Sequence, residues 1–187
     1  MGNGDMAART SETHPLRIAE LPAGAGRIGL SLCPGKYQAD AWTGAWARDL
    51  DVDLDAVRAW GADAVVTLVE AHELRALRVE GMGGAVAARG MRWFHLPIRD
   101  YHAPCARFEA DWAEAGRALR ALLRSGGRVF VHCKGGLGRA GTVSARLLVE
   151  LGEAPDAAVR AVRAARRGAI ETGAQEAHVR ALAMVAE

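Results

Sequence analysis

The segment from His132 to Thr142, which reads HCKGGLGRAGT, constrains the fold more than any other part of the chain. The apolar run just before it, Arg128 to Val131, predicts a short buried strand. The apolar residues that follow it stand at helical spacing: Val143, Leu147, Leu148 and Leu151. The glycine-rich segment is therefore predicted to be a tight loop that joins the end of a strand to the start of a helix.

A loop of this kind is suited to bind an anion. Its backbone N–H groups converge, and the positive end of the helix dipole adds to their field. The same field favours the thiolate form of a cysteine at the strand end, which here is Cys133. Arg139 stands six positions later and offers a planar pair of donors to two phosphate oxygens. The residues between them are expected to cradle the phosphate: Lys134, Gly135, Gly136, Leu137 and Gly138.

Two other phosphate-binding motifs share parts of this pattern and are rejected. Gly136 to Gly141 fits G-x-G-x-x-G, the dinucleotide-binding fingerprint, but that unit needs another strand after the helix. Here Gly152 ends the helix and Pro155 opens a further helix. The Walker A motif fails because Lys134 precedes the glycines and no Gly-Lys-Ser/Thr is present.

Length and charge bound the class of protein. A chain of 187 residues can bury one good core, so we expect a disordered tail over residues 1–15 and one folded domain over residues 16–187. The net charge of +2 argues against nucleic-acid binding driven by bulk charge. No apolar run approaches the length of a transmembrane helix, and the N-terminus lacks the apolar region of a signal peptide.

The three cysteines, Cys33, Cys105 and Cys133, are an odd number at wide spacings. They suggest neither a disulfide framework nor a metal site, and they fit a reducing, cytoplasmic location. Cys105 could act as a resolving thiol for an oxidised Cys133, although a small apolar contact is the more common role for such a residue.

Strand and helix patterns alternate along the chain. Strands are expected at residues 27–32, 64–69, 91–97 and 128–131, and helices at 54–60, 72–78, 84–89, 108–124 and after the glycine-rich loop. Each connection is long enough for a crossover. We therefore expect an α/β fold with a single, mainly parallel sheet flanked by helices on both faces.

A candidate general acid lies at the end of the strand over residues 91–97. Parallel strands end on the same edge of a sheet, where the sites of such folds collect. Asp100 follows this strand and precedes Cys133 by 33 residues, so it should arrive beside the thiol. A phosphate ester needs its leaving oxygen protonated, which a carboxyl group at this place could do. A turn or helix-capping aspartate is the alternative.

These motifs resemble those of the cysteine-dependent, dual-specificity type of protein phosphatase. His132-Cys133 followed by five residues and Arg139 is similar to the signature of that family. The segments Pro97 to Asp100, Gly168 to Gln175 and Leu32 to Gly35 resemble its kinase-associated (cyclin-dependent kinase inhibitor-type) branch. The similarity runs from about residue 27 to the end of the chain.

The resemblance implies a role for each matching residue. Cys133 would be the nucleophile, Arg139 would bind the phosphoryl oxygens, and Asp100 would be general acid and then general base. His132 would hold the loop, and Gln175 would help to position water, although a glutamine on a surface helix is an equal alternative.

One position departs from the family pattern. Ala140 stands where a Ser or Thr usually follows the arginine, and the hydroxyl of Thr142 is not expected to replace it fully. Slow breakdown of a phosphocysteine is therefore plausible.

The function implied is hydrolysis of phosphate monoesters through a cysteinyl-phosphate intermediate. The expected substrates are phosphotyrosine or phosphoserine/threonine in proteins, or a small phosphomonoester. We expect no cofactor or metal, no nucleic-acid or membrane partner, and a monomer. The alternatives are a slow, phosphate-binding pseudophosphatase that serves as an interaction module, and a rhodanese-like sulfur transferase, which would need no Asp100.

Overall fold

The computed structural model describes residues 7–42 and 44–186. A five-stranded sheet runs through its centre in the order β1-β2-β7-β5-β6. Its strands are β1 (Ala19–Ala23), β2 (Gly26–Ser31), β5 (Ala64–Thr67), β6 (Arg92–His95) and β7 (Arg128–His132). All neighbours in the sheet are parallel except β1, which pairs antiparallel with β2. The mainly parallel sheet predicted from the sequence is therefore confirmed.

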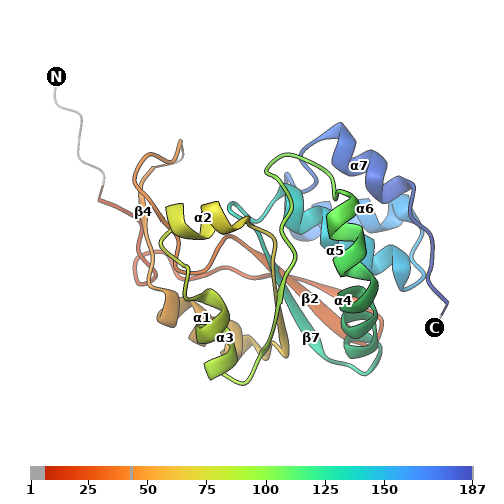
Figure 1. Cartoon of the computed structure of the whole chain (residues 1–187), viewed down its shortest axis with the longest axis horizontal. Coiled ribbons are helices and arrows are strands. Elements are labelled where there is room, and N and C mark those ends of the chain that lie inside the picture. Colours follow the sequence, from red (N-terminus) through yellow and green to blue (C-terminus); the bar gives the residue numbers. More distant parts are fainter. Residues whose placement is uncertain (1–6, 43, 187) are drawn as a thin grey trace.

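Helices cover both faces of this sheet, as predicted (Figure 1). One face carries α1 (Leu50–Trp60), α2 (Ala71–Ala76) and α3 (Met82–Ala88). The other carries α4 (Ala106–Arg124), α5 (Gly138–Glu150), α6 (Pro155–Ala165) and α7 (Gly173–Arg180). Beyond β7, the described residues form helices and no strand, which agrees with the rejection of a dinucleotide-binding unit.

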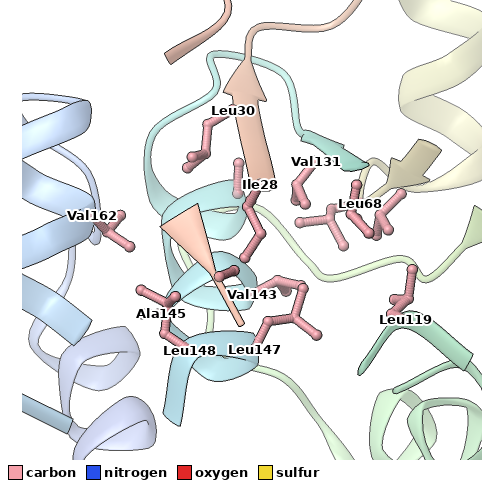
Figure 2. Close-up of a cluster of buried hydrophobic side chains, with 14 of the residues drawn as sticks. Ile28, Leu30, Leu68, Leu119, Val131, Val143, Ala145, Leu147, Leu148 and Val162 are labelled. Atoms are coloured by element: carbon pink, nitrogen blue, oxygen red, sulfur yellow. The ribbon is translucent and has the colours of Figure 1, made fainter. Parts of the chain in front are cut away.

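Strand β7 divides the core into two clusters because its side chains alternate between faces. Val129 and Val131 point to the cluster beneath α4, α5 and α6, whereas Phe130 points to the cluster beneath α1 and α3. In the first cluster, Ile28 and Leu30 of β2 meet the buried side chains of α5 (Figure 2). Every residue of α5 is buried, so this helix and the loop that begins it are fixed within the core.

The parallel strands β5, β6 and β7 end on the same edge of the sheet. Leu68 and Ile98 continue from the ends of β5 and β6, and the Ile98 N–H donates to the Leu68 carbonyl. The chain segments after β6 and β7 therefore lie close together, and this edge receives the glycine-rich loop.

Three features differ from the expectations. Strand β1 is an added edge strand, and its Pro22 is tolerated there because an edge leaves one side of the strand unpaired. A separate two-stranded sheet joins β3 (Tyr37–Gln38) to β4 (Trp46–Ala47). Strands of two residues each leave too short a pattern to detect in a sequence.

The third difference concerns the N-terminal segment, for which a disordered tail over residues 1–15 was expected. Residues 1–6 lie outside the described residues. From residue 7 onward the segment packs on the body: Ser11 is 5% exposed, and its hydroxyl accepts a hydrogen bond of 2.9 Å from the Asp49 N–H. Arg9 forms a β-bridge with Trp46. The predicted domain boundary at residue 16 stays a prediction.

Candidate active site

The glycine-rich loop joins β7 to α5 and folds around the Cys133 sulfur. Cys133 is 3% exposed, and its Sγ accepts a hydrogen bond of 3.2 Å from the Gly136 N–H. Gly136 has φ +73°, and a Cβ there would overlap the backbone of Ser31 at the end of β2. The loop can thus close around the sulfur only because this position is glycine.

Arg139 is held beside the sulfur by a carboxylate that the sequence analysis did not single out. Its Nη1 and Nη2 donate to the two oxygens of Glu73 in α2, at 2.6 and 2.9 Å. Nη1 also donates to the Ile98 carbonyl at 3.0 Å. Against the opposing effect of burial, the bonds to Glu73 and the proximity of Cys133 raise the pKa of Arg139. The guanidinium is 1% exposed and permanently charged.

One donor of this guanidinium is left over. Among the residues that the structure describes, none accepts a hydrogen bond from the buried Nε of Arg139. A buried N–H without a partner is costly, so the arrangement calls for an acceptor that the protein itself does not supply. An anion bound in the loop next to Cys133 would provide it.

Asp100 reaches the same site from the segment after β6, as its strand-end position predicted. Its Oδ1 lies 3.0 Å from Nη2 of Arg139, and its side chain is 44% exposed. Tyr101, which follows it, has φ +59° and turns the chain so that its N–H donates to Asp100 Oδ1 at 3.1 Å. The structure therefore brings Cys133, Arg139 and Asp100 together at one edge of the sheet.

His132 supports the loop from below. Trp93 donates to the Thr67 hydroxyl at 2.9 Å, and the Thr67 hydroxyl lies 2.8 Å from His132 Nε2. Nδ1 lies 3.3 Å from the Cys133 carbonyl, and because a carbonyl only accepts, this contact places the imidazole proton on Nδ1 and leaves Nε2 to accept from the Thr67 hydroxyl. Burial lowers the pKa of His132 to about 4, so the ring is neutral at pH 7.

The two hydroxyl positions discussed above behave differently. Ala140 is fully buried and brings no hydroxyl to the loop. The Thr142 hydroxyl donates to the Gly138 carbonyl at 2.8 Å, one turn back in α5. Its single proton is therefore engaged within the helix, and whether it assists the reaction stays a prediction.

Gln175 is buried and caps α7. Its Oε1 accepts from the N–H groups of Glu171 and Thr172 at 2.9 and 3.2 Å, and its Nε2 donates to the His102 carbonyl at 3.3 Å. A Cβ on Gly138 would lie 3.0 Å from the Gln175 amide, so this side chain stands directly beside the loop. Gln175 is therefore a buried residue, and its hydrogen bonds stabilise the start of α7 and tie it to the segment that contains His102.

Comparison with known proteins decides the family. A family model for the DSP-PTPase phosphatase domain of the Swiss Army Knife proteins matches residues 48–179. The chain belongs to this dual-specificity phosphatase family. Cyclin-dependent kinase inhibitor 3 of Sus scrofa is 29% identical over 168 residues, which cover 86% of this chain and 76% of that protein.

Two solved structures agree with this assignment. Kinase associated phosphatase, crystallised with its catalytic-site cysteine replaced by serine, superposes with a TM-score of 0.77 at 26% identity, covering 88% of this chain and 92% of that one. Tk-PTP in its active form is 34% identical, with a TM-score of 0.59, covering 82% and 88% of the two chains. The chain is a cysteine-dependent protein phosphatase, and its resemblance to the kinase-associated branch is confirmed.

The phosphatase loop is also braced from outside by cations that the sequence did not reveal as a group. Arg166 donates to the carbonyls of Gly136 and Gly135 at 3.1 and 3.2 Å. The Lys134 carbonyl accepts from the Cys33 N–H at 3.3 Å and lies 3.5 Å from Lys36 Nζ. The outward carbonyls of the loop thus accept from donors outside it, whereas the Gly136 N–H points inward to the Cys133 sulfur.

The thiol groups of the other two cysteines are not assigned a role in catalysis. Cys105 is exposed at the start of α4, and burial strongly raises the pKa of the Cys33 thiol. Within residues 7–42 and 44–186, no group of three or more His, Cys, Asp or Glu side chains could hold a metal ion. No helix in the described part of the chain is long and apolar enough to cross a membrane.

Proposed function

We propose that this phosphatase hydrolyses phosphotyrosine or phosphoserine/threonine esters in proteins, with Cys133 as nucleophile, Arg139 as phosphate ligand and Asp100 as acid–base. The observation that carries the proposal is the unpartnered Nε of Arg139, buried beside a cysteine that a glycine loop encloses. A phosphoryl oxygen would accept from Nε, and the loop N–H groups from Gly135 to Gly138 would bind the other oxygens.

The first step transfers the phosphoryl group to sulfur. The Cys133 thiolate attacks phosphorus, the P–O bond to the substrate breaks, and the leaving oxygen takes the proton of Asp100. The ion pair between Asp100 and Nη2 of Arg139 supports this role, since Arg139 would hold the phosphoryl group. Glu73 fixes the guanidinium from behind and leaves its Nε edge for the substrate.

The second step releases phosphate. The Asp100 carboxylate takes a proton from water, the water oxygen attacks phosphorus, and the P–S bond breaks to return the thiolate. We assign His132 and Thr142 to support the loop. Gln175 is assigned the same duty, since its Oε1 already accepts two backbone N–H groups, while one proton of its Nε2 remains for water.

Two findings support a phosphoprotein as the substrate. Relatives with similar sequences include cyclin-dependent kinase inhibitor 3 proteins, and a structural relative is named kinase associated phosphatase. A partner that is itself phosphorylated, such as a kinase, is a substrate consistent with those names. Action in the reducing cytoplasm is consistent with Cys33, Cys105 and Cys133 all being free thiols, and the monomeric state stays a prediction.

A turnover panel tests the proposal. Nitrophenyl phosphate, phosphotyrosine and phosphothreonine peptides, and small phosphomonoesters are compared for kcat/KM with the wild-type enzyme and with Cys133→Ser. We expect hydrolysis of phosphopeptides by the wild type, and none by Cys133→Ser, which should still bind vanadate through the loop and Arg139. Equal rates for the two proteins would refute the assignment of Cys133, and hydrolysis of small phosphates alone would refute the substrate class.

A further inference from the structure

A further carboxylate lies beside the phosphatase loop, where the loop meets the segment before α7. Gly138 directly precedes Arg139 and is the first residue of α5. A Cβ at Gly138 would overlap Oε2 of Glu171, so this carboxylate lies against the loop, in the room that a missing side chain leaves. The proposed reaction uses the carboxyl group of Asp100 and gives that of Glu171 no role.

The backbone that presents Glu171 is strained and firmly held. Ile170, the residue before it, has φ +59°, a left-handed conformation that a β-branched residue rarely adopts. The Ile170 N–H donates to the Leu137 carbonyl of the loop at 3.3 Å, and the Ile170 carbonyl accepts from Arg163 at 3.0 Å. The Glu171 N–H donates to Gln175 Oε1 at 2.9 Å. Because strain of this kind persists mainly at functional positions, the turn points to a use for Glu171.

The charge of Glu171 has no partner in the part of the chain that the structure describes. Its side chain is exposed, and no lysine, arginine or histidine there forms an ion pair with it. Glu176, one turn further along, pairs instead with Arg163 and Arg180, each at 2.7 Å. Arg163, which holds the backbone next to Glu171, is thus already paired. The Glu171 carboxylate is therefore available to a cation from another molecule.

A phosphoryl group in the loop would stand close to this carboxylate. The N–H groups from Gly135 to Gly138 are the proposed ligands of the phosphoryl oxygens, and Glu171 lies against Gly138. Two negative groups at such a place repel each other, and the repulsion grows as they are removed from water. A positively charged side chain of the substrate, placed next to Glu171, would offset this repulsion.

We propose that Glu171 is a specificity-determining residue, which selects phosphopeptides that carry Arg or Lys close to the phosphoresidue. The inference rests on the proposed function, since the phosphate of the peptide must occupy the loop around Cys133. Arginine suits the position better than lysine, because its planar guanidinium can donate to both oxygens of one carboxylate. An exposed carboxylate on a fixed backbone can make this contact without touching the phosphate itself.

The test compares peptides that differ in one charge. Each peptide carries a single phosphoresidue, and the panel places Arg, Ala or Glu at successive positions on either side of it. The measured quantity is the ratio of kcat/KM for the Arg and Ala peptides at each position. For the wild type we expect a ratio of about 5 to 10 at the best position, as one partly exposed ion pair would give. Added salt should lower this ratio, because it screens exposed charges.

Two variants and a matched control separate selection by charge from a structural role. Glu171→Gln keeps the size of the side chain and should lower the ratio towards one. Glu171→Lys should reverse the preference, so that Glu peptides are hydrolysed faster than Arg peptides. Glu153→Lys makes the same change of charge at an exposed residue beyond the opposite end of α5 and should keep the wild-type ratio. A merely structural effect of either Glu171 variant would slow all peptides alike and would leave the ratio as it was.

The outcomes are distinct. A wild-type ratio near one at every position, in peptides that are hydrolysed, overturns the inference alone. A wild-type ratio that persists in Glu171→Gln overturns it as well, and this variant decides the matter if Glu171→Lys does not fold. Preference for O-phosphoethanolamine over every Arg peptide, lost in Glu171→Gln, would assign the cation to a small molecule and overturn the peptide substrate. If the wild type hydrolyses no phosphopeptide of the panel, the proposed function itself fails, and the inference fails with it.

Discussion

At the scale of single residues, the pairing of Asp100 with Arg139 has a consequence for the reaction. Both the carboxylate and an incoming phosphoryl group seek the same guanidinium edge. We expect a phosphoryl dianion at Arg139 to displace the Asp100 carboxylate, because two negative groups beside one guanidinium repel each other. Because the Asp100 side chain is 44% exposed, it has room to move aside as substrate enters.

Asp100→Asn tests this role. The variant should lose a factor of about 10² to 10⁴ in kcat/KM for alkyl phosphates, whose leaving oxygen must be protonated. The loss should be much smaller for nitrophenyl phosphate, which departs readily as an anion. Steady-state rates for the two substrates across a range of pH provide the measurement. Equal losses for both leaving groups would show that Asp100 is only a structural partner of Arg139.

Ala140 provides a second test at this scale. Breakdown of the phosphocysteine expels the Cys133 thiolate, and a hydrogen bond to the departing sulfur accelerates that step. The Thr142 hydroxyl is engaged by Gly138, so we expect the second step to limit turnover of good leaving groups. Rapid mixing with nitrophenyl phosphate should then give a burst of product that approaches one per active site.

Ala140→Ser should shrink that burst and raise the steady-state rate about fivefold, the worth of one ordinary hydrogen bond. Ala140→Gly is the matched control, because it changes the same site without adding a hydroxyl. A linear time course in the wild type, with no gain from the serine, would mean that another donor already assists the sulfur.

At the scale of elements, the sequence predicted the segment that holds Cys133 better than it predicted the role of helix α2, which holds Arg139 through Glu73. The strand, loop and helix around Cys133 were predicted because apolar periodicity and glycine spacing are both local signals. Helix α2 was expected, but the role of Glu73 was not, since its partner Arg139 lies 66 residues away. In the sequence, an acidic residue on a short helix looks the same whether it is exposed to solvent or paired with a distant arginine in the core.

The helix α2 nevertheless decides how Arg139 is presented. Glu73 is the N3 residue of a capping box, and its Oε2 accepts from the Glu70 N–H at 2.8 Å while both oxygens hold the guanidinium. Folding of six residues of helix is thereby coupled to the geometry of the phosphate ligand. A change in α2 should act on catalysis although α2 itself contributes no reacting group.

Glu73→Gln tests this coupling. The variant removes the charge of the carboxylate that binds both Nη atoms of the buried guanidinium and leaves only the partly exposed Asp100 as a counter-charge, so the free energy of unfolding should fall by up to about 3 kcal/mol. Displacement of Arg139 should lower kcat/KM on the order of a hundredfold. Glu80→Gln, at an exposed glutamate shortly after α2, is the control and should behave as the wild type. Unchanged activity in Glu73→Gln would mean that Ile98 and Asp100 suffice to position the guanidinium.

At the scale of the whole molecule, the parallel sheet places separate parts of the chain at one edge, and this is why topology could be predicted better than contacts. Alternating strands and helices imply that strand ends coincide, and Asp100 was therefore expected at the edge that holds Cys133, where the structure pairs it with Arg139. The N-terminal segment gave no such signal, because its polar composition matches that of a disordered tail. Its order depends on particular contacts, such as those of Ser11 with Asp49 and Arg9 with Trp46.

The acid sensitivity of the whole fold should follow from His132 and Glu73, in two separate ranges of pH. The pKa of His132 is lowered from 6.5 to about 4 in the folded protein, chiefly by burial. Between these values the unfolded chain binds a proton that the folded chain does not, so stability falls as the pH falls. The loss amounts to about 3 kcal/mol at most and should be complete near the folded value.

Glu73 acts at lower pH. Although burial opposes the shift, the hydrogen bonds from Arg139 and from the Glu70 backbone lower the pKa of Glu73 in the folded protein. Its ion pair therefore stabilises the fold above about pH 4.3, the ordinary value for a glutamate, and is lost as the pH falls through the lowered folded value. Denaturant unfolding at intervals from pH 7.5 to pH 3 measures both contributions on the same protein.

Two variants assign the two ranges. His132→Asn keeps an N–H for the Cys133 carbonyl but cannot titrate, so its free energy of unfolding should change less with pH between about 6.5 and 4 than that of the wild type. Glu73→Gln should retain the wild-type slope in that range and lose it only below about pH 4.3. The change in the free energy of unfolding with pH is compared, and not the free energy itself, because each substitution lowers the free energy of unfolding at every pH. A wild-type slope in His132→Asn would show that other groups govern the loss of stability, and that the buried imidazole is not the proton acceptor on unfolding.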